Sequence, residues 1–136
     1  MDEPSILTRQ GDFYFYYKQE QDAYYLFSYL GTDANVVLPD DINGHPYRIH
    51  SWTFRSNPDI ASITIPKGVT EISGGAFYEC GNLTDAFFEI TSGWVKETSW
   101  TTAPYDSTDL ADSQKAATAL KELDIYYDTM VRSEEP

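Results

Sequence analysis

The stretch "ASITIPKGVTEISGGAFYECGNL", residues 61–83, carries its apolar residues in alternating pairs that fit neither an ordinary helix nor a simple hairpin. Pro66 interrupts the run, and two glycines precede Ala76 and Phe77. A shift of 23 positions matches several apolar or small residues with residues of similar kind. The matched pairs are Ile49 with Ile72, Thr53 with Ala76, Phe54 with Phe77, Ile60 with Leu83, and Ile65 with Phe88. A period of this length is typical of proteins built from stacked repeats.

A further match lies upstream, at a longer spacing. The segment Val37-Leu38-Pro39 resembles Thr64-Ile65-Pro66 at a shift of 27 positions. The four additional residues fall in "DDINGHPYR", residues 40–48, which contains the turn signals Asn-Gly and His-Pro. The sequence therefore predicts one complete repeat, one repeat with an insertion, and the start of a third.

Each repeat contains a short predicted strand. The segments 57–66 ("NPDIASITIP") and 80–89 ("CGNLTDAFFE") space their apolar residues as I-x-x-I-x-I and L-x-x-A-x-F, which resembles the strand of a leucine-rich repeat. Alternation along a strand predicts that the residues between the apolar positions point outward. These outward residues are Ala61, Ser62 and Thr64 in one repeat, and Thr84, Asp85 and Phe87 in the next.

The segment "ITIPKGVTEISGGAFYECGNL" resembles the BspA-like class of leucine-rich repeats, which occurs in surface proteins of gut and oral bacteria. Its Ile-Pro, Val-Thr-x-Ile, Ala-Phe and Cys landmarks carry the resemblance, which extends from about Asp12 to Arg132. It departs from the class at Trp52-Thr53, and the third repeat stops at Glu89. The resemblance implies an extracellular or cell-surface location and a non-catalytic, adhesion-type role in binding protein partners. The class shares no catalytic motif, so no catalytic residue is implied.

The predicted fold is α+β, a single domain over residues 1–136. A short leucine-rich-repeat-like β-solenoid over residues 39–89 is expected between two caps, because repeats at the ends of an array cannot bury their apolar faces alone. The N-terminal cap, residues 12–38, is predicted to be a β-hairpin, since two aromatic runs flank the polar "QEQ". A further strand, Asn35 to Leu38, is expected to follow it.

The C-terminal cap, residues 90–136, is predicted to contain one helix over about residues 113–127. Asp112 is a suitable N-cap. An apolar stripe of helical spacing follows, formed by Ala116, Ala119, Leu120 and Leu123. Residues 91–108 are expected to form a hairpin or a long loop, with Trp94 and Trp100 packed inside the cap.

Composition excludes several classes of function. The chain has 22 acidic and 9 basic residues, a net charge of −13, so binding to nucleic acid or to an anionic membrane through a basic patch is not expected. No apolar run reaches membrane-spanning length, so no membrane insertion is expected, and "MDEPSILTRQ" lacks the features of a signal peptide. Cys80 is the only cysteine, which excludes an internal disulfide.

The residues that could carry catalysis or bind a metal lack the necessary spacing. His45 and His50 form no HxH or HExxH motif. No histidine stands at a recognisable spacing from Cys80, which is expected to be buried. The many acidic residues form no 12-residue calcium loop and show no sign of two carboxylates converging across a cleft. The chain is therefore predicted to be non-enzymatic and to need no cofactor or metal.

Binding is the expected role, and the repeat alignment selects the candidate residues. Trp52 occupies the place of Gly75, and Phe87 occupies the place of Thr64; exposed aromatic residues are enriched at recognition sites. Neighbouring segments could instead cover both rings. The candidate binding residues are Trp52, Ser62, Thr64, Asp85 and Phe87.

Three functions follow as hypotheses. The first is a bacterial surface domain that binds a protein partner. The second is a carbohydrate-binding module that uses Trp52, Trp100 and nearby tyrosines to bind a glycan. The third is a structural spacer or a self-association unit.

Overall fold

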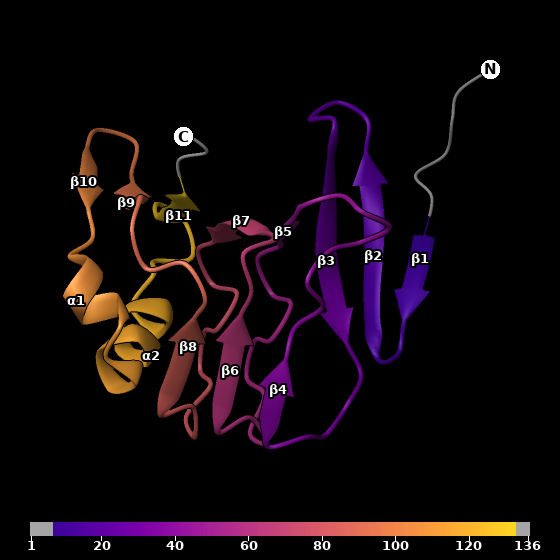
Figure 1. Cartoon of the computed structure of the whole chain (residues 1–136), viewed down its shortest axis with the longest axis horizontal. Coiled ribbons are helices and arrows are strands. Elements are labelled where there is room, and N and C mark those ends of the chain that lie inside the picture. Colours follow the sequence, from indigo (N-terminus) through magenta and orange to yellow (C-terminus); the bar gives the residue numbers. More distant parts are fainter. Residues whose placement is uncertain (1–6, 133–136) are drawn as a thin grey trace.

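The structure, a computed structural model, describes residues 7–132, so the two ends of the predicted domain lie outside the described residues. These residues form an eight-stranded sheet, a three-stranded sheet and two short helices (Figure 1). The fold is therefore mostly β with a small helical part, as the sequence predicts.

The larger sheet combines antiparallel and parallel pairing. In spatial order its strands are β1 (Leu7–Gln10), β2 (Phe13–Lys18), β3 (Ala23–Tyr29), β5 (Tyr47–Ile49), β7 (Val69–Ser73), β11 (Thr129–Arg132), β9 (Trp94–Glu97) and β10 (Thr102–Pro104). The predicted N-terminal hairpin is the antiparallel pair β2–β3, and β1 adds a strand that the sequence did not predict. The central strands β3, β5 and β7 are parallel.

The smaller sheet contains the strands of the repeats. It is formed by β4 (Asn35–Val37), β6 (Ser62–Ile65) and β8 (Asp85–Phe88), all parallel. Thr64 pairs with Val37 on one side and with Phe87 on the other, so the predicted shifts of 27 and 23 positions are the observed registers. The same 23-residue spacing joins Ile49 of β5 to Ile72 of β7.

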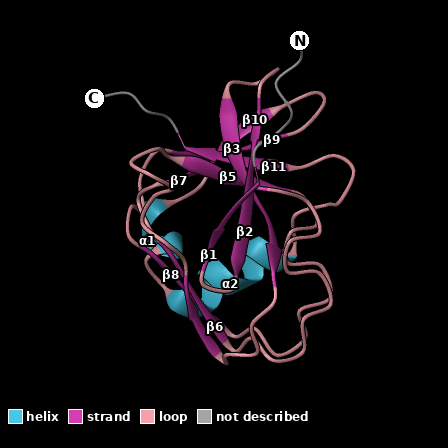
Figure 2. Ribbon diagram, turned by 90° about the vertical axis from the view of Figure 1, so that its right-hand side faces the viewer, coloured by secondary structure: helices cyan, strands magenta, loops and turns pink. Residues whose placement is uncertain are grey.

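The core lies between the two sheets and the turns that connect them (Figure 2, which looks along the row of repeats). The inward residues of β6 and β8 and the facing residues of β5 and β7 are buried, because alternation directs every second side chain to the interior. Phe54 and Phe77 are fully buried in the turns and stack with their ring centroids 5.1 Å apart.

The turn after β5 repeats its backbone conformation in the turn after β7. Trp52 has a φ of 82° and Gly75, 23 residues later, has a φ of 86°. Ser56 and Glu79 form a second such pair, at 55° and 60°. The Phe54 N–H donates to the Ala76 carbonyl oxygen at 2.9 Å, which joins the two turns. The backbone of the repeat is therefore kept even where a tryptophan replaces a glycine.

One of the two helices covers the β8 edge of the smaller sheet, and the other packs against that helix. These are α1 (Ser107–Leu110) and α2 (Ser113–Lys121), and α2 packs beside β8 (Figure 1). The carboxylate of Asp112 caps α2, as predicted, by accepting from the N–H groups of Gln114 and Lys115. The helix is shorter than the predicted 113–127, because the chain turns at Asp124 and then enters the larger sheet as β11.

The segment that follows α2 fits closely against the repeats. A Cβ atom at Gly74 would lie 2.0 Å from the carbonyl oxygen of Asp124 and 2.5 Å from that of Asp128, so only glycine permits this contact. β11 then pairs with β7 on one side and with β9 on the other. The C-terminal residues thereby connect the repeats to the β9–β10 hairpin, which was expected as a hairpin or a long loop.

Candidate binding surface

The outward side of the smaller sheet brings together four of the five predicted binding residues. We call this surface the outer face. It is formed by Asn35 and Val37 of β4, Ser62 and Thr64 of β6, and Asp85 and Phe87 of β8. The residues between them, Val36, Ile63 and Ala86, are buried in the core. The parallel registers align the outward side chains in two rows across the strands.

The first row is polar and fixed by hydrogen bonds. The Ser62 hydroxyl donates to the Asn35 side-chain oxygen at 2.8 Å. The Asp85 carboxylate accepts from the Ser113 hydroxyl at 2.6 Å and from the Thr84 hydroxyl at 2.8 Å. These hydrogen bonds lower the pKa of Asp85, and the bond from Ser113 contributes most. The carboxylate is therefore ionised at neutral pH. Because Ser113 begins α2, the row continues onto the helix.

The second row is apolar at both edges. Val37 is 67% exposed and Phe87 is 50% exposed, while Thr64 between them is half-buried. The C-terminal segment therefore leaves much of the Phe87 ring in contact with solvent. Exposed apolar side chains mark an interaction site when they form a patch with a polar rim.

Trp52, the fifth predicted residue, lies on another side of the repeats, in the turn after β5. Its ring is 42% exposed, and the guanidinium carbon of Arg55 lies 4.3 Å from the ring centroid. The same guanidinium lies 5.8 Å from the ring of Tyr78 in the next turn. The structure thus separates Trp52 from the outer face and places it in a cluster of its own.

A third exposed group combines Trp100, which the carbohydrate-binding hypothesis includes, with two tyrosines that the sequence did not single out. We call it the aromatic cluster: Trp100, Tyr126 and Tyr127. Trp100 is 82% exposed, so the prediction that it packs inside the C-terminal cap is wrong, whereas Trp94 is buried as predicted. The ring centroids of Trp100 and Tyr127 lie 6.5 Å apart, and those of Tyr126 and Tyr127 lie 6.3 Å apart.

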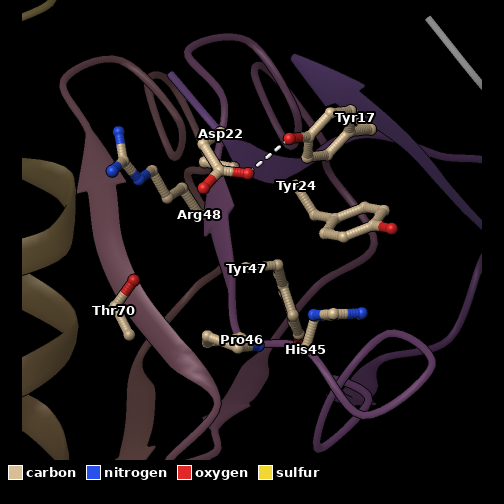
Figure 3. A pocket seen from close by; sticks show the side chains of 9 residues that line it. Tyr17, Asp22, Tyr24, His45, Pro46, Tyr47, Arg48 and Thr70 are labelled. Atoms are coloured by element: carbon tan, nitrogen blue, oxygen red, sulfur yellow. Dashed lines mark hydrogen bonds between the residues drawn. The ribbon is translucent and has the colours of Figure 1, made fainter. Parts of the chain in front are cut away.

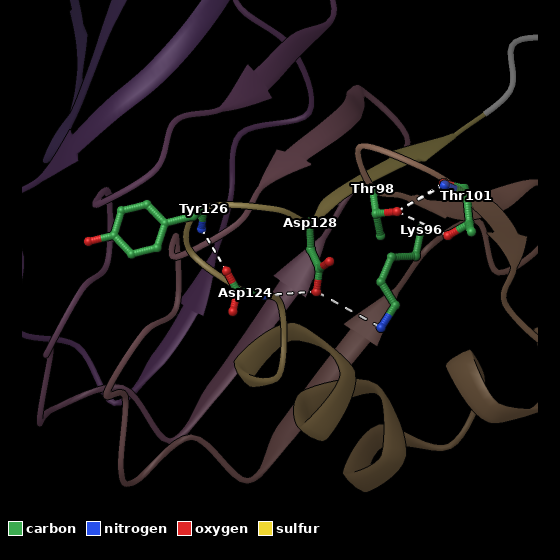
Figure 4. Close-up of polar contacts among 6 residues, drawn as sticks. All are labelled: Lys96, Thr98, Thr101, Asp124, Tyr126 and Asp128. Carbon is green, nitrogen blue, oxygen red and sulfur yellow. Dashed lines mark hydrogen bonds and ion pairs between the residues drawn. The ribbon is translucent and has the colours of Figure 1, made fainter.

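Polar contacts fix the two loops that carry the aromatic cluster (Figure 4). The Asp124 carboxylate accepts from the Tyr126 N–H at 2.8 Å, and the Asp128 carboxylate accepts from the Asp124 N–H at 2.9 Å. Lys96 of β9 lies 4.0 Å from the Asp128 carboxylate. In the other loop, the Thr98 hydroxyl oxygen accepts from the Thr101 N–H at 3.0 Å. The exposed rings therefore project from an ordered backbone.

The residues considered for catalysis or metal binding lie apart from one another. Cys80 is buried, its thiol donates to the Phe54 carbonyl oxygen, and burial raises its pKa, so it is a neutral thiol. The His45 ring stacks on Tyr24, while His50 is half-buried and burial lowers its pKa. Within residues 7–132 no three His, Cys, Asp or Glu side chains are grouped as metal ligands.

Two solved structures share this fold. The first is a leucine-rich cell surface protein from Faecalibacterium prausnitzii, with a TM-score of 0.54 and 22% identity over 68% of this chain. The second is a leucine-rich repeat protein from Bacteroides capillosus, with a TM-score of 0.50 and 24% identity over 60% of this chain. The matches span 25% and 64% of those proteins' own lengths. The chain matches no family model and no curated protein.

The likeness to these two structures confirms that the fold is that of bacterial leucine-rich-repeat proteins. At this level of identity it shows the fold alone. No helix within residues 7–132 is both long and apolar enough to cross a membrane.

Proposed function

We propose that this chain is a bacterial cell-surface interaction domain that binds a protein partner through the outer face, without catalysis. In this proposal residues 39–89 form a short solenoid of the BspA-like class between the caps 12–38 and 90–136. The extracellular location and the adhesion-type role rest on the fold shared with a cell surface protein. The observation that supports this binding site is that an exposed row with apolar edges lies beside a polar row held by hydrogen bonds.

The outer face has the mixed character of a protein-binding surface. Val37 and Phe87 offer apolar area that a partner can remove from water, at about 25 cal/mol per Å². The polar row offers hydrogen-bond groups that are already held in place, so little rotamer entropy is lost on binding. The net charge of −13 favours partners with a basic surface, whose association then slows as salt is added.

The test is a binding screen of the purified chain against arrayed extracellular-matrix proteins and bacterial surface proteins. The double variant Val37→Thr/Phe87→Thr removes the apolar row and keeps residues suited to strands. Tyr78→Thr, which removes an exposed ring from another side of the repeats, is the matched control. The proposal expects saturable binding that the double variant loses and the control retains. Binding lost only in the control would instead assign the site to the cluster around Trp52.

Carbohydrate binding is the second candidate function, and the aromatic cluster favours it. Trp100 and the adjacent tyrosines are exposed on ordered loops, an arrangement that can stack on sugar rings. A glycan array run beside the protein array tests it, with Trp100→Thr as the variant. Binding of glycans alone, lost in this variant, would replace the protein-binding proposal.

A further inference from the structure

A pocket of about 460 Å³ opens between the N-terminal hairpin and the repeats, away from both the outer face and the aromatic cluster. Its wall comes from the β2–β3 turn, the 45–48 segment and β7. The lining includes Tyr17, Asp22, Tyr24, His45, Arg48 and Thr70. Figure 3 shows Tyr17 and Tyr24 on one side, Arg48 and Thr70 on the other, and His45 and Pro46 below. The volume is sufficient for one or two sugar rings.

One side of the pocket is an aromatic wall. The Tyr24 ring stacks against His45, with centroids 5.0 Å apart and planes 30° apart, and its centroid also lies 5.0 Å from that of Tyr17. The three rings support one another, so the wall keeps its shape without a ligand. The C–H face of a pyranose packs against aromatic rings of this kind.

Polar groups of both charges share the pocket with this wall. The Tyr17 hydroxyl donates to the Asp22 carboxylate (Figure 3), and this bond is the main reason for the raised pKa of Tyr17. A carboxylate has a second oxygen that can accept from a ligand. The Arg48 guanidinium is half-buried and lies 3.7 Å from the Glu71 carboxylate. With one negative and one positive side chain in its lining, the pocket favours a neutral polyhydroxyl ligand over an ion.

We propose that this pocket binds a neutral sugar ring, with the aromatic wall against its C–H face and Asp22, Arg48 and the Thr70 hydroxyl bonding its hydroxyl groups. The site is independent of the outer face, so it does not rest on the protein-binding proposal. It is also a different site from the aromatic cluster.

The experiment is an NMR titration of the ¹⁵N-labelled chain with the methyl glycosides of glucose, galactose, mannose and N-acetylglucosamine. Asp22→Asn is the informative variant, because asparagine tolerates the φ of 50° at this position and keeps the side-chain shape while removing the charge. Glu20→Gln, an exposed acid of the same turn that does not line the pocket, is the matched control.

The expected result is a saturable shift of the amide signals of residues 22–24 and of His45, Tyr47 and Arg48 with at least one glycoside. Asp22→Asn should weaken that binding about tenfold, as the loss of a charge-assisted hydrogen bond does, and Glu20→Gln should leave it unchanged. Shifts confined to the aromatic cluster, or no shift at millimolar glycoside, would overturn the proposal. Equal binding by the wild-type chain and Asp22→Asn would do the same.

Discussion

The rings of Phe54 and Phe77 lie 11° from parallel with their centroids 5.1 Å apart, although 23 residues separate them in the chain. Both rings are fully buried, one in each of two successive turns. Truncation of Phe77 to alanine removes this contact and leaves a cavity between the turns, so Phe77→Ala should lower the free energy of unfolding by about 3–5 kcal/mol. Urea denaturation measures the change.

The neighbouring exposed residue supplies the control for this core prediction. Tyr78→Ala removes a ring of similar size from the surface and should change the free energy of unfolding by less than about 1 kcal/mol. Equal effects of the two substitutions would show that the Phe54–Phe77 stack does not join the repeats.

Trp52 adopts a backbone conformation that favours glycine, with a φ of 82°. A side chain in this left-handed region costs about 1–2 kcal/mol, which glycine avoids. We therefore expect Trp52→Gly to be more stable than Trp52→Ala by about 1 kcal/mol, although both lose the contact with Arg55. Thermal and urea unfolding of the two variants, compared side by side, measure the difference. A more stable alanine variant would show that the turn does not keep the conformation of the turn at Gly75.

Gly74 is the point at which the segment after α2 contacts the repeats. Because an added Cβ would lie 2.0 Å from the Asp124 carbonyl oxygen, Gly74→Ala should destabilise the chain by about 1–3 kcal/mol. Gly81→Ala is the matched control, since a Cβ there meets no atom within 4 Å. The effect should also appear as faster hydrogen exchange of the β11 amides. If Gly74→Ala and Gly81→Ala are equally stable, the close approach at residue 124 is not a constraint on the fold.

The hydrogen bond between Ser113 and Asp85 gives a prediction on pH dependence. The pKa of Asp85 in the folded protein lies below the ordinary 3.8. Its hydrogen bonds therefore stabilise the folded protein fully at pH values above 3.8. That contribution is lost as the pH falls through the lower, folded-state pKa. Ser113→Ala removes the largest cause of the shift and should raise the pKa of Asp85 towards 3.8.

An NMR titration of the Asp85 carboxyl carbon measures that pKa in both chains. Thr118→Ala, which removes a hydroxyl elsewhere on α2, should leave the titration unchanged. An unchanged Asp85 pKa in Ser113→Ala would contradict the geometry of the polar row.

The registers of the repeats were predictable because the buried positions recur at the same spacing as the strands. Each inward position of β6 has an apolar counterpart in β8, so a shift of 23 aligns both the sequence and the strands. Strand β11 was not predictable, since its four residues carry one buried side chain, Met130, and its partners lie far away in the chain. The apolar helical stripe reaches Leu123, and the predicted helix was extended from it to residue 127, whereas α2 ends at Lys121.

The candidate surfaces were predictable only in part. Alternation along the strands identified Ser62, Thr64, Asp85 and Phe87 as outward, but the bond that links Asp85 to Ser113 spans 28 residues and leaves no local pattern. Trp100 was expected to pack inside the C-terminal cap. Its position at the tip of the β9–β10 hairpin exposes it instead.

The proposed function requires that the outer face contact the protein partner. The most direct measurement is the dissociation constant of the partner found in the screen, by surface plasmon resonance, for wild type, Phe87→Thr, Trp52→Ala and Tyr78→Thr. We predict that Phe87→Thr weakens binding at least about tenfold, the loss expected of an aromatic hot-spot residue, while the other two variants stay within about twofold of wild type. Unchanged binding by a folded Phe87→Thr, together with weakened binding by Trp52→Ala or Tyr78→Thr, would contradict it.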